Sequence, residues 1–170
     1  MSDQFDDLVG WADAAMVVVT AATDTERAGC LVGFHSQCSI DPPRYALWLS
    51  TANHTYRVAL QATHLGVHFL STDDHDVAEL FGGLTDDDPA VGHADKLSRI
   101  AHRIGAFGVP LLDGCARRVV VRRVSIEDSG GDHVCFVTEP VEVDNSPPSS
   151  ASPLRLSDVD DVTPGHPSGR

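Results

Sequence analysis

The stretch AGCLVGFHSQCSIDPP, residues 28–43, alternates along its length between apolar residues and small or polar ones. A two-residue period of this kind predicts a β-strand with one face in a core. The even positions form the apolar face, with Ser36 as its exception: Ala28, Cys30, Val32, Phe34, Cys38 and Ile40. The other face begins with Gly29 and Gly33. Glycine in a strand loses packing and costs backbone entropy, so this pair indicates that another group comes close.

Polar side chains follow the two glycines before Pro42 and Pro43 end the strand. They are His35, Ser36, Gln37 and Ser39. A flat ring lying on the bare backbone beside the glycines would meet these hydrogen-bonding groups at its edge. The alternative is a strand that borders a β-bulge near the rim of a barrel. The residues alone leave both interpretations open.

Further runs of β-branched and aromatic residues predict strands on both sides of this stretch. We expect them at residues 16–23, 44–50, 64–71, 116–128 and 132–143, the last two forming a hairpin around residues 129–131. Helices are expected near the N-terminus (Phe5, Leu8, Val9 and Ala12) and at residues 51–63, 73–83 and 94–104, with 108–115 as a turn-rich crossing. About six strands with short helices and no regular βαβ alternation predict a mostly β, antiparallel barrel.

The chain of 170 residues is long enough for one domain with a sizeable core. We expect this domain to cover residues 1–145. After Asn145 the sequence NSPPSSASP loses apolar residues and gains proline and serine. Residues 146–170 are therefore expected to form a C-terminal tail, available to a partner subunit, rather than a core element.

The charge of the chain excludes two classes of partner. It has 25 acidic and 12 basic side chains, a formal net charge of −13, which repels nucleic acid and anionic membrane surfaces. No apolar run approaches the roughly 20 residues that a membrane helix needs. The N-terminal residues 1–16 carry aspartates where a signal peptide would carry lysines, so we expect a cytoplasmic protein.

The cysteines and histidines do not form a pattern of metal ligands. The four cysteines show neither C-x-x-C spacing nor another zinc-binding rhythm, so no metal site is expected. Cys30 and Cys38 lie on the apolar face of the strand, which predicts small buried hydrophobic residues in a reducing compartment. His64 and His68 are four residues apart, but on a strand they would stand roughly 13 Å apart, too far to share one ion.

The stretch STANHTYRVAL, residues 50–60, is a candidate phosphate site. Asn53 or Thr55 is expected to cap the helix, which leaves free N–H groups and the positive end of the helix dipole at its start. Such an end binds phosphate, and an anion there would offset the unfavourable position of Arg57 in the first turn. The alternative is an ordinary capped surface helix whose Arg57 points into solvent.

The stretch GGDHVCF, residues 130–136, is a candidate for a second ligand contact. Gly130 and Gly131 make the hairpin turn, and His133 begins the returning strand. An imidazole at the rim of a pocket would bind or orient a ligand. The alternative gives Asp132 a role in the turn alone and leaves His133 at the end of a strand without a function.

Taken in order, the quoted segments resemble one protein family. MVVVTA, RAGCLVGFHSQCSIDPP, ANHTYRVA, DVAELFGG, GVPLLDGC and GDHVCFVTEPV, spread over roughly residues 15–144, are similar to the flavin reductase-like family of FMN-binding split-barrel proteins. The resemblance implies a six-stranded antiparallel split β-barrel of Greek-key type. It also implies a homodimer with flavin bound near the subunit interface.

The resemblance carries site residues to matching positions. It implies that the flavin ring lies along the strand that ends in DPP, at Leu31, Val32, Gly33, Phe34, Ser36 and Gln37. It implies that the flavin phosphate is held by Ser50, Thr51, Asn53, His54 and Thr55. It places the reduced nicotinamide near Asp132 and His133, with His133 as the catalytic residue that orients it.

The implied function is an NAD(P)H-dependent flavin reductase that uses FMN or FAD, with NADH or NADPH as co-substrate. Such an enzyme would supply reduced flavin to a monooxygenase partner. The chain departs from the family pattern where many members have a Thr-x-Asn-Ser run and this one has Leu31 to Phe34, and also at Pro140 and in its tail. The alternative is therefore a flavin-binding electron carrier, or an interaction module, that does not itself oxidise nicotinamide.

Overall fold

Seven strands of one antiparallel sheet form the main body of the protein. The computed structural model describes residues 2–83, 96–146 and 151–162. The sheet runs in the order β2-β1-β5-β8-β9-β4-β3. Its strands are β1 (Val17–Ala22), β2 (Arg27–Val32), β3 (His35–Ser39), β4 (Arg44–Ser50), β5 (His64–Phe69), β8 (Arg117–Asp128) and β9 (His133–Asn145). The expected mostly β, antiparallel fold is therefore confirmed.

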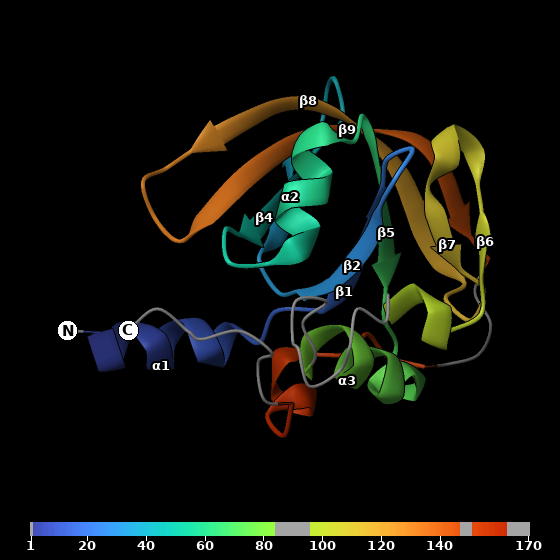
Figure 1. Cartoon of the computed structure of the whole chain (residues 1–170). Coiled ribbons are helices and arrows are strands. Elements are labelled where there is room, and N and C mark those ends of the chain that lie inside the picture. The colour runs from blue at the N-terminus through green and yellow to red at the C-terminus, as the bar shows by residue number, and fades with distance from the viewer. Residues whose placement is uncertain (1, 84–95, 147–150, 163–170) are drawn as a thin grey trace.

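Short helices and a small second sheet complete the described structure. The helices are α1 (Ser2–Ala12), α2 (His54–Gln61) and α3 (His75–Gly83), with 3₁₀ turns η1 (Thr72–Asp74), η2 (Lys96–Arg99), η3 (Ala106–Gly108) and η4 (Leu156–Val159). Strands β6 (His102–Ile104) and β7 (Pro110–Leu112) pair beside the main sheet (Figure 1). None of the helices in the described ranges has the length and apolar character needed to cross a membrane.

Residues 28–40 form two strands instead of the single expected one. The chain leaves β2 at Val32, passes Gly33 and Phe34, and enters β3 at His35. β2 pairs with β1 at one edge of the sheet, whereas β3 pairs with β4 at the other. Two consecutive strands thus form the two edges, so the sheet must curl to let the short segment between them join both edges. This break is why the sheet has seven strands where the sequence predicts about six.

The break also exchanges the two faces of the stretch. On β2 the even residues face the core, and Ala28, Cys30 and Val32 are buried. On β3 the odd residue His35 lies opposite the buried Leu47, and the odd residues His35 and Ser39 are the half-buried ones there. The expectation that the even positions stay apolar and buried is wrong beyond Val32. Exposed residues on that face are Phe34 at 55% exposure, Ser36, Cys38, and Ile40 at 85%.

The two glycines of the stretch have different neighbours. A Cβ added to Gly29 would lie 2.6 Å from Cε1 of Phe81, so the group that approaches this glycine is a ring from α3. A Cβ added to Gly33 would lie 3.4 Å from Sδ of Met16, which is ordinary contact. Gly29 is therefore explained by packing, whereas a side chain at position 33 would fit against Met16 without a clash.

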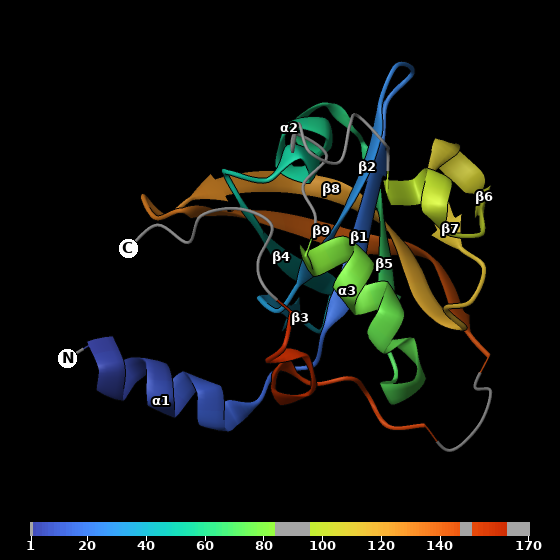
Figure 2. The same ribbon diagram turned by 60° about the horizontal axis from the view of Figure 1, so that its bottom comes forward.

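Two hydrophobic clusters hold the fold together. The inner cluster lies inside the curled sheet and includes Leu47, Leu65 and Phe136. The second cluster packs α3 against the outside of β1 and β2, with the fully buried Val18 and Phe81 in contact with the segment after residue 150. Figure 2 shows α3 and this segment on the same side of the sheet.

The C-terminal segment is part of the core, although the sequence predicts a tail from residue 146. Within residues 151–162, Leu154 is 1% exposed and Val159 is 6% exposed, and both belong to the second cluster. Backbone bonds tie the segment to the start of β1: the N–H of Met16 donates to the carbonyl of Leu154 at 2.9 Å. Two buried residues were too weak a pattern to show this from the sequence. The remaining tail residues, 147–150 and 163–170, lie outside the described residues.

Helix α1 confirms the expected N-terminal helix but does not pack into either cluster. Its apolar residues Phe5, Leu8 and Trp11 are exposed, and Figure 2 shows the helix projecting away from the body. At its end Asp13 adopts a left-handed φ of 48°. The Asp13 carboxylate accepts hydrogen bonds of 2.9 Å from the backbone N–H and hydroxyl of Ser157, which lowers the pKa of this carboxyl.

Other expectations can be compared with the structure directly. The hairpin at residues 129–131 is confirmed, with the N–H of Gly130 bonded to the Asp128 carboxylate at 2.7 Å. The helix expected at 94–104 is wrong over its second half, because Arg103 pairs with Leu111 in β6 and β7. The crossing expected at 108–115 contains β7 for the same reason; residues 94 and 95 lie outside the described ranges.

His68 is buried in β5 as a neutral ring. Its Nδ1–H donates to the carbonyl of Val18 at 3.2 Å, and its Nε2 accepts the N–H of Leu112 at 3.1 Å. Burial lowers the pKa of His68 from its usual 6.5 to about 4. The ring thus joins β1, β5 and β7 only while it is uncharged.

We predict that acid weakens the fold through His68. The unfolded chain takes up a proton near pH 6.5 and the folded one only near pH 4, so stability is lost as pH falls between these values. The full shift corresponds to about 3 kcal/mol. Urea unfolding between pH 7.5 and 4.5 should show a shallower decline in His68→Gln than in the natural chain. Equal slopes would contradict this role. His35, whose pKa burial also lowers, is unchanged in both proteins.

We also predict that Gly29→Ala destabilises the protein, because the buried ring of Phe81 must shift to make room. Overpacking of this kind costs about 1–3 kcal/mol. Gly33→Ala, whose added methyl meets only ordinary contact, is the matched control. Chemical unfolding of both variants measures the difference. Equal stabilities would show that Phe81 does not depend on a glycine at position 29.

Candidate functional site

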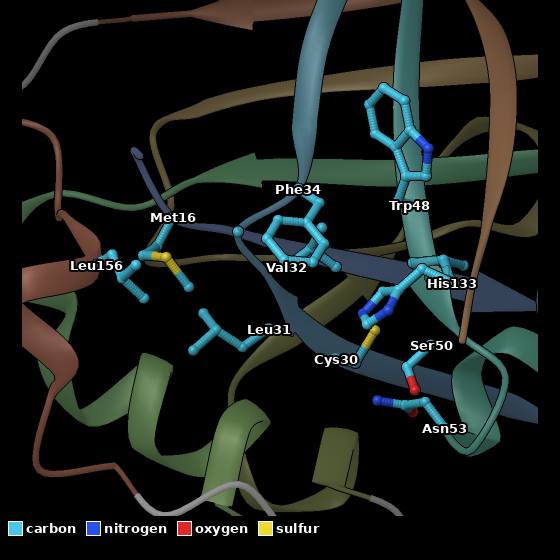
Figure 3. A pocket seen from close by; sticks show the side chains of 12 residues that line it. Met16, Cys30, Leu31, Val32, Phe34, Trp48, Ser50, Asn53, His133 and Leu156 are labelled. Atoms are coloured by element: carbon cyan, nitrogen blue, oxygen red, sulfur yellow. The ribbon is translucent and has the colours of Figure 1, made fainter. Parts of the chain in front are cut away.

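A pocket of about 250 Å³ lies where the chain passes from β2 to β3. Its floor is the last part of β2 together with the backbone of Gly33 and Phe34. Figure 3 shows that Ser50, Asn53 and His133 form one end of it. The opposite end is apolar, with Met16, Leu31 and Leu156. The pocket therefore suits a ligand with a broad apolar part and a polar end.

The aromatic side of the pocket is held by the strand break. The backbone N–H of Trp48 donates to the carbonyl of Phe34 at 2.9 Å, which ties β4 to the crossing segment. The Phe34 ring then lies edge-on to the imidazole of His133, with 5.0 Å between ring centroids. Phe34 is 55% exposed, so its ring stands at the mouth of the pocket.

His133 has a defined orientation. Its Nδ1–H donates to the carboxylate of Asp132 at 2.8 Å, so the other ring nitrogen, Nε2, is left for further contacts. The position of Asp132 is in turn fixed by Thr51, whose backbone N–H donates to the Asp132 carbonyl at 2.9 Å. The turn after β4 and the start of β9 thus form one hydrogen-bonded unit.

The polar end of the pocket is the start of α2. Asn53 is the N-cap, as the sequence predicts, and its Oδ1 accepts the N–H of Thr55 at 3.0 Å. Thr55 is fully buried, and its hydroxyl has no hydrogen-bond partner within the described residues. Nearby, NH2 of Arg57 lies 3.0 Å from Nδ1 of His54. The positive end of the α2 dipole attracts an anion at this end.

The lining of the pocket carries no formally charged side chain among the residues described here. On a chain with a net charge of −13, this makes the pocket a neutral site whose most positive feature is the end of α2. An anionic group would bind there, and an uncharged ring would bind against the apolar part.

The structure brings seven of the expected site residues into this pocket: Leu31, Val32, Gly33, Phe34, Ser50, Asn53 and His133. It places four others beside the polar end without lining it: Thr51, His54, Thr55 and Asp132. Ser36 and Gln37 lie further along β3, because the stretch breaks at Gly33 and the two residues follow the opposite edge of the sheet.

Five lining residues were missed by sequence reasoning: Met16, Cys30, Trp48, Leu49 and Leu156. Trp48 had a usable signal, since an aromatic residue close before Ser50 on a strand lies near the same end of the sheet. Met16 and Leu156 had none, because their meeting depends on the bonds between the two terminal segments. Cys30 was expected to be buried, and it is, within the pocket wall.

The acidic and histidine clusters elsewhere do not resemble this pocket. His75, Asp76 and Glu79 on α3 hold possible ligand atoms within 4.8 Å of one another, which the sequence did not predict. Asp76 and Glu79 are exposed, and the half-buried His75 already contacts Asp161 at 3.1 Å. His64 stacks on Phe107, whereas His68 is hydrogen-bonded to Val18. His64 and His68 therefore do not form one metal site.

Comparison with known proteins gives the family. The model of the flavin reductase like domain matches residues 12–159. The chain belongs to the flavin reductase-like family. It is 30% identical over 141 residues to SmoA, an NADH-dependent FMN reductase of Agrobacterium fabrum. The matched region covers 81% of this chain and 74% of SmoA.

Two solved structures share the fold of this family member. An FMN-binding protein from Thermus thermophilus, with bound cyclohexenone, matches over 77% of this chain and 70% of the Thermus chain. The TM-score is 0.68 and the sequence identity is 22%. A nitrilotriacetate monooxygenase component B homologue from Mycobacterium thermoresistibile matches 88% of this chain and 78% of its own. Its TM-score is 0.74 at 19% identity.

Proposed function

We propose that this protein is an NADH-dependent FMN reductase. The observation that carries the proposal is a neutral pocket bounded by the bare crossing at Gly33, the start of α2 and an oriented His133. The named activity of the relative SmoA supports it. We expect FAD to be a poorer substrate than FMN, and NADPH a poorer one than NADH.

The residues present fit FMN. The apolar part of the pocket, with Leu31, Val32, Gly33 and Phe34, would take the flat ring against main-chain atoms, since Gly33 has no side chain to lift it. Ser50 and Asn53 line the polar end where the phosphate would bind, and Thr51, His54 and the unpartnered hydroxyl of Thr55 lie beside that end. A buried hydroxyl without a partner is costly, and a phosphate oxygen or a water bound with it would satisfy that group.

His133 would orient the nicotinamide. Asp132 holds Nδ1–H, so the ring cannot turn away from the pocket without losing a hydrogen bond. Nε2 is then available to a polar group of the nicotinamide, with the Phe34 ring beside it. When FMN and NADH are bound, they supply the hydride acceptor and the hydride, and the protein contributes orientation and electrostatics.

We propose that the protein works as a homodimer with the family's split barrel. The curled sheet, with consecutive strands at its two edges, supports a six-stranded Greek-key barrel in which β2 and β3 count as one broken strand. The pocket of about 250 Å³ is smaller than the roughly 300–1,000 Å³ usual for ligand sites, so a second copy would complete its walls.

The reaction product suggests the partner. Reduced flavin is consumed by monooxygenases, and the component B relative supports a flavin-dependent monooxygenase as the acceptor. We also propose a cytoplasmic location, because the reaction consumes NADH and all four cysteines are free thiols. The electron-carrier alternative is favoured by one observation: Phe34 lies against His133, where a nicotinamide would need to enter.

NADH oxidation tests the proposal. We expect the purified protein with FMN to consume NADH, followed at the nicotinamide absorbance band, and FAD or NADPH to support slower turnover. His133→Ala should raise KM for NADH about tenfold, the loss of about 1.4 kcal/mol of binding, with little change in the affinity for FMN.

His75→Ala, a variant of an exposed histidine on α3, is the control and should match the natural chain. Tight FMN binding without turnover with either nicotinamide would reject the reductase and favour the electron carrier. Absence of both binding and turnover would reject a flavin function.

A further inference from the structure

A second cavity, of about 160 Å³, opens inside the curled sheet at its other end. It lies near Arg44 and Pro140, whereas the first pocket lies at Ser50 and His133, at the other end of the segment over which β4 pairs with β9. The two share none of their described lining residues. The walls of the second cavity are apolar or aromatic: Pro43, Tyr45, Phe69, Val119, Val121 and Pro140.

The volume of the second cavity limits the size of the ligand that it can hold. A protein cavity of roughly 150 Å³ with apolar walls holds one benzene ring. The same space is too small for the three fused rings of a flavin. A ligand of the second cavity is therefore built on a single ring.

The walls select a flat ring. The Tyr45 and Phe69 rings lie edge to face, with centroids 6.1 Å apart and planes at 71°. A third aromatic ring adds favourably to such an arrangement. The Tyr45 hydroxyl already donates to Nδ1 of His35 at 2.6 Å, and Nε2–H of His35 donates to the carbonyl of Ala15 at 2.7 Å. Polar recognition of a ligand must therefore come from elsewhere.

The mouth of the cavity supplies that recognition. Gln37 and Arg44 are its polar lining residues. NH1 of Arg44 lies 3.0 Å from Oε2 of Glu139, and Arg122 contacts the other oxygen of the same carboxylate. Two guanidinium groups thus share one carboxylate, so Glu139 alone does not neutralise both Arg44 and Arg122. A second carboxylate, brought by a ligand, would balance the other guanidinium through charge-assisted hydrogen bonds.

We propose that this cavity binds a monocyclic aromatic carboxylate, with the ring between Tyr45 and Phe69 and the carboxylate on Arg44. Gln37, which the sequence resemblance placed beside the flavin ring, lies at the mouth of this second cavity. The site does not depend on the proposed reductase function, since its residues are separate from those of the first pocket.

Calorimetric titration of the full chain with benzoate tests the proposal. We expect benzoate to bind, and benzyl alcohol, a neutral ring of similar size, to bind about tenfold more weakly because it lacks the charge. Arg44→Met should weaken benzoate binding about tenfold, and Val119→Phe, which fills the cavity, should abolish it. Arg103→Met is the matched control, because Arg103 pairs with Asp113 away from the cavity, and it should bind benzoate normally.

Saturating FMN separates this proposal from the reductase function. Benzoate binding that persists with FMN present supports a second site, whether or not NADH is oxidised. Displacement of benzoate by FMN would overturn the proposal by assigning the ligand to the first pocket. Failure of benzoate to bind the folded natural chain would overturn the proposal. Benzoate binding to Arg44→Met and Val119→Phe with the affinity of the natural chain would also overturn it.

Discussion

The peptide between Gly33 and Phe34 carries the chain from one edge of the sheet to the other, and most of the site follows from that crossing. The hydrogen bond from Trp48 N–H to the Phe34 carbonyl fixes the crossing to β4 at 2.9 Å. Because β2 and β3 are consecutive and occupy opposite edges, the sheet has to curl. The same residues that close the sheet form the floor of the pocket, so fold and site share one constraint.

The far wall of the pocket depends on contacts between distant parts of the sequence. Met16 and Leu156 meet there because the segment after residue 150 bonds to the start of β1, with Leu156 N–H donating to the Ala14 carbonyl at 2.9 Å. Leu154 and Phe81 pack beneath them in the second cluster. Loss of this packing would open the apolar end of the pocket while leaving the polar end, built on α2 and the β8–β9 hairpin, in place.

Local signals in the sequence were sufficient for most strands of the main sheet and for the helix cap at the polar end of the candidate site. β-Branched runs located β1 and β8, and the Asn53 cap located α2, because each depends on neighbouring residues. The burial of Cys38 was predicted wrongly. The alternating pattern was extended across the break at Gly33 and Phe34, and nothing in these two residues marks the end of a strand. The contribution of residues 151–162 was also missed, since it comes from contacts with Met16 and α3 that no local pattern records.

Proline at position 140 illustrates how a departure from the family pattern is accommodated. It cannot donate to the sheet, and it lies opposite Val121 where the pairing of β8 and β9 shifts register. The shift lets Arg122 meet Glu139 beside Arg44, and so creates the charged mouth of the second cavity. A local constraint on the backbone thereby sets the chemistry of a surface far from the crossing at Gly33.

The most direct measurement is a crystal structure of the protein grown with FMN. The account predicts the flavin ring on the backbone at Gly33 and Phe34, with its phosphate at the start of α2 beside Asn53 and Thr55. Flavin bound elsewhere, or Phe34 and Trp48 closed over a slot that FMN does not enter, would contradict it.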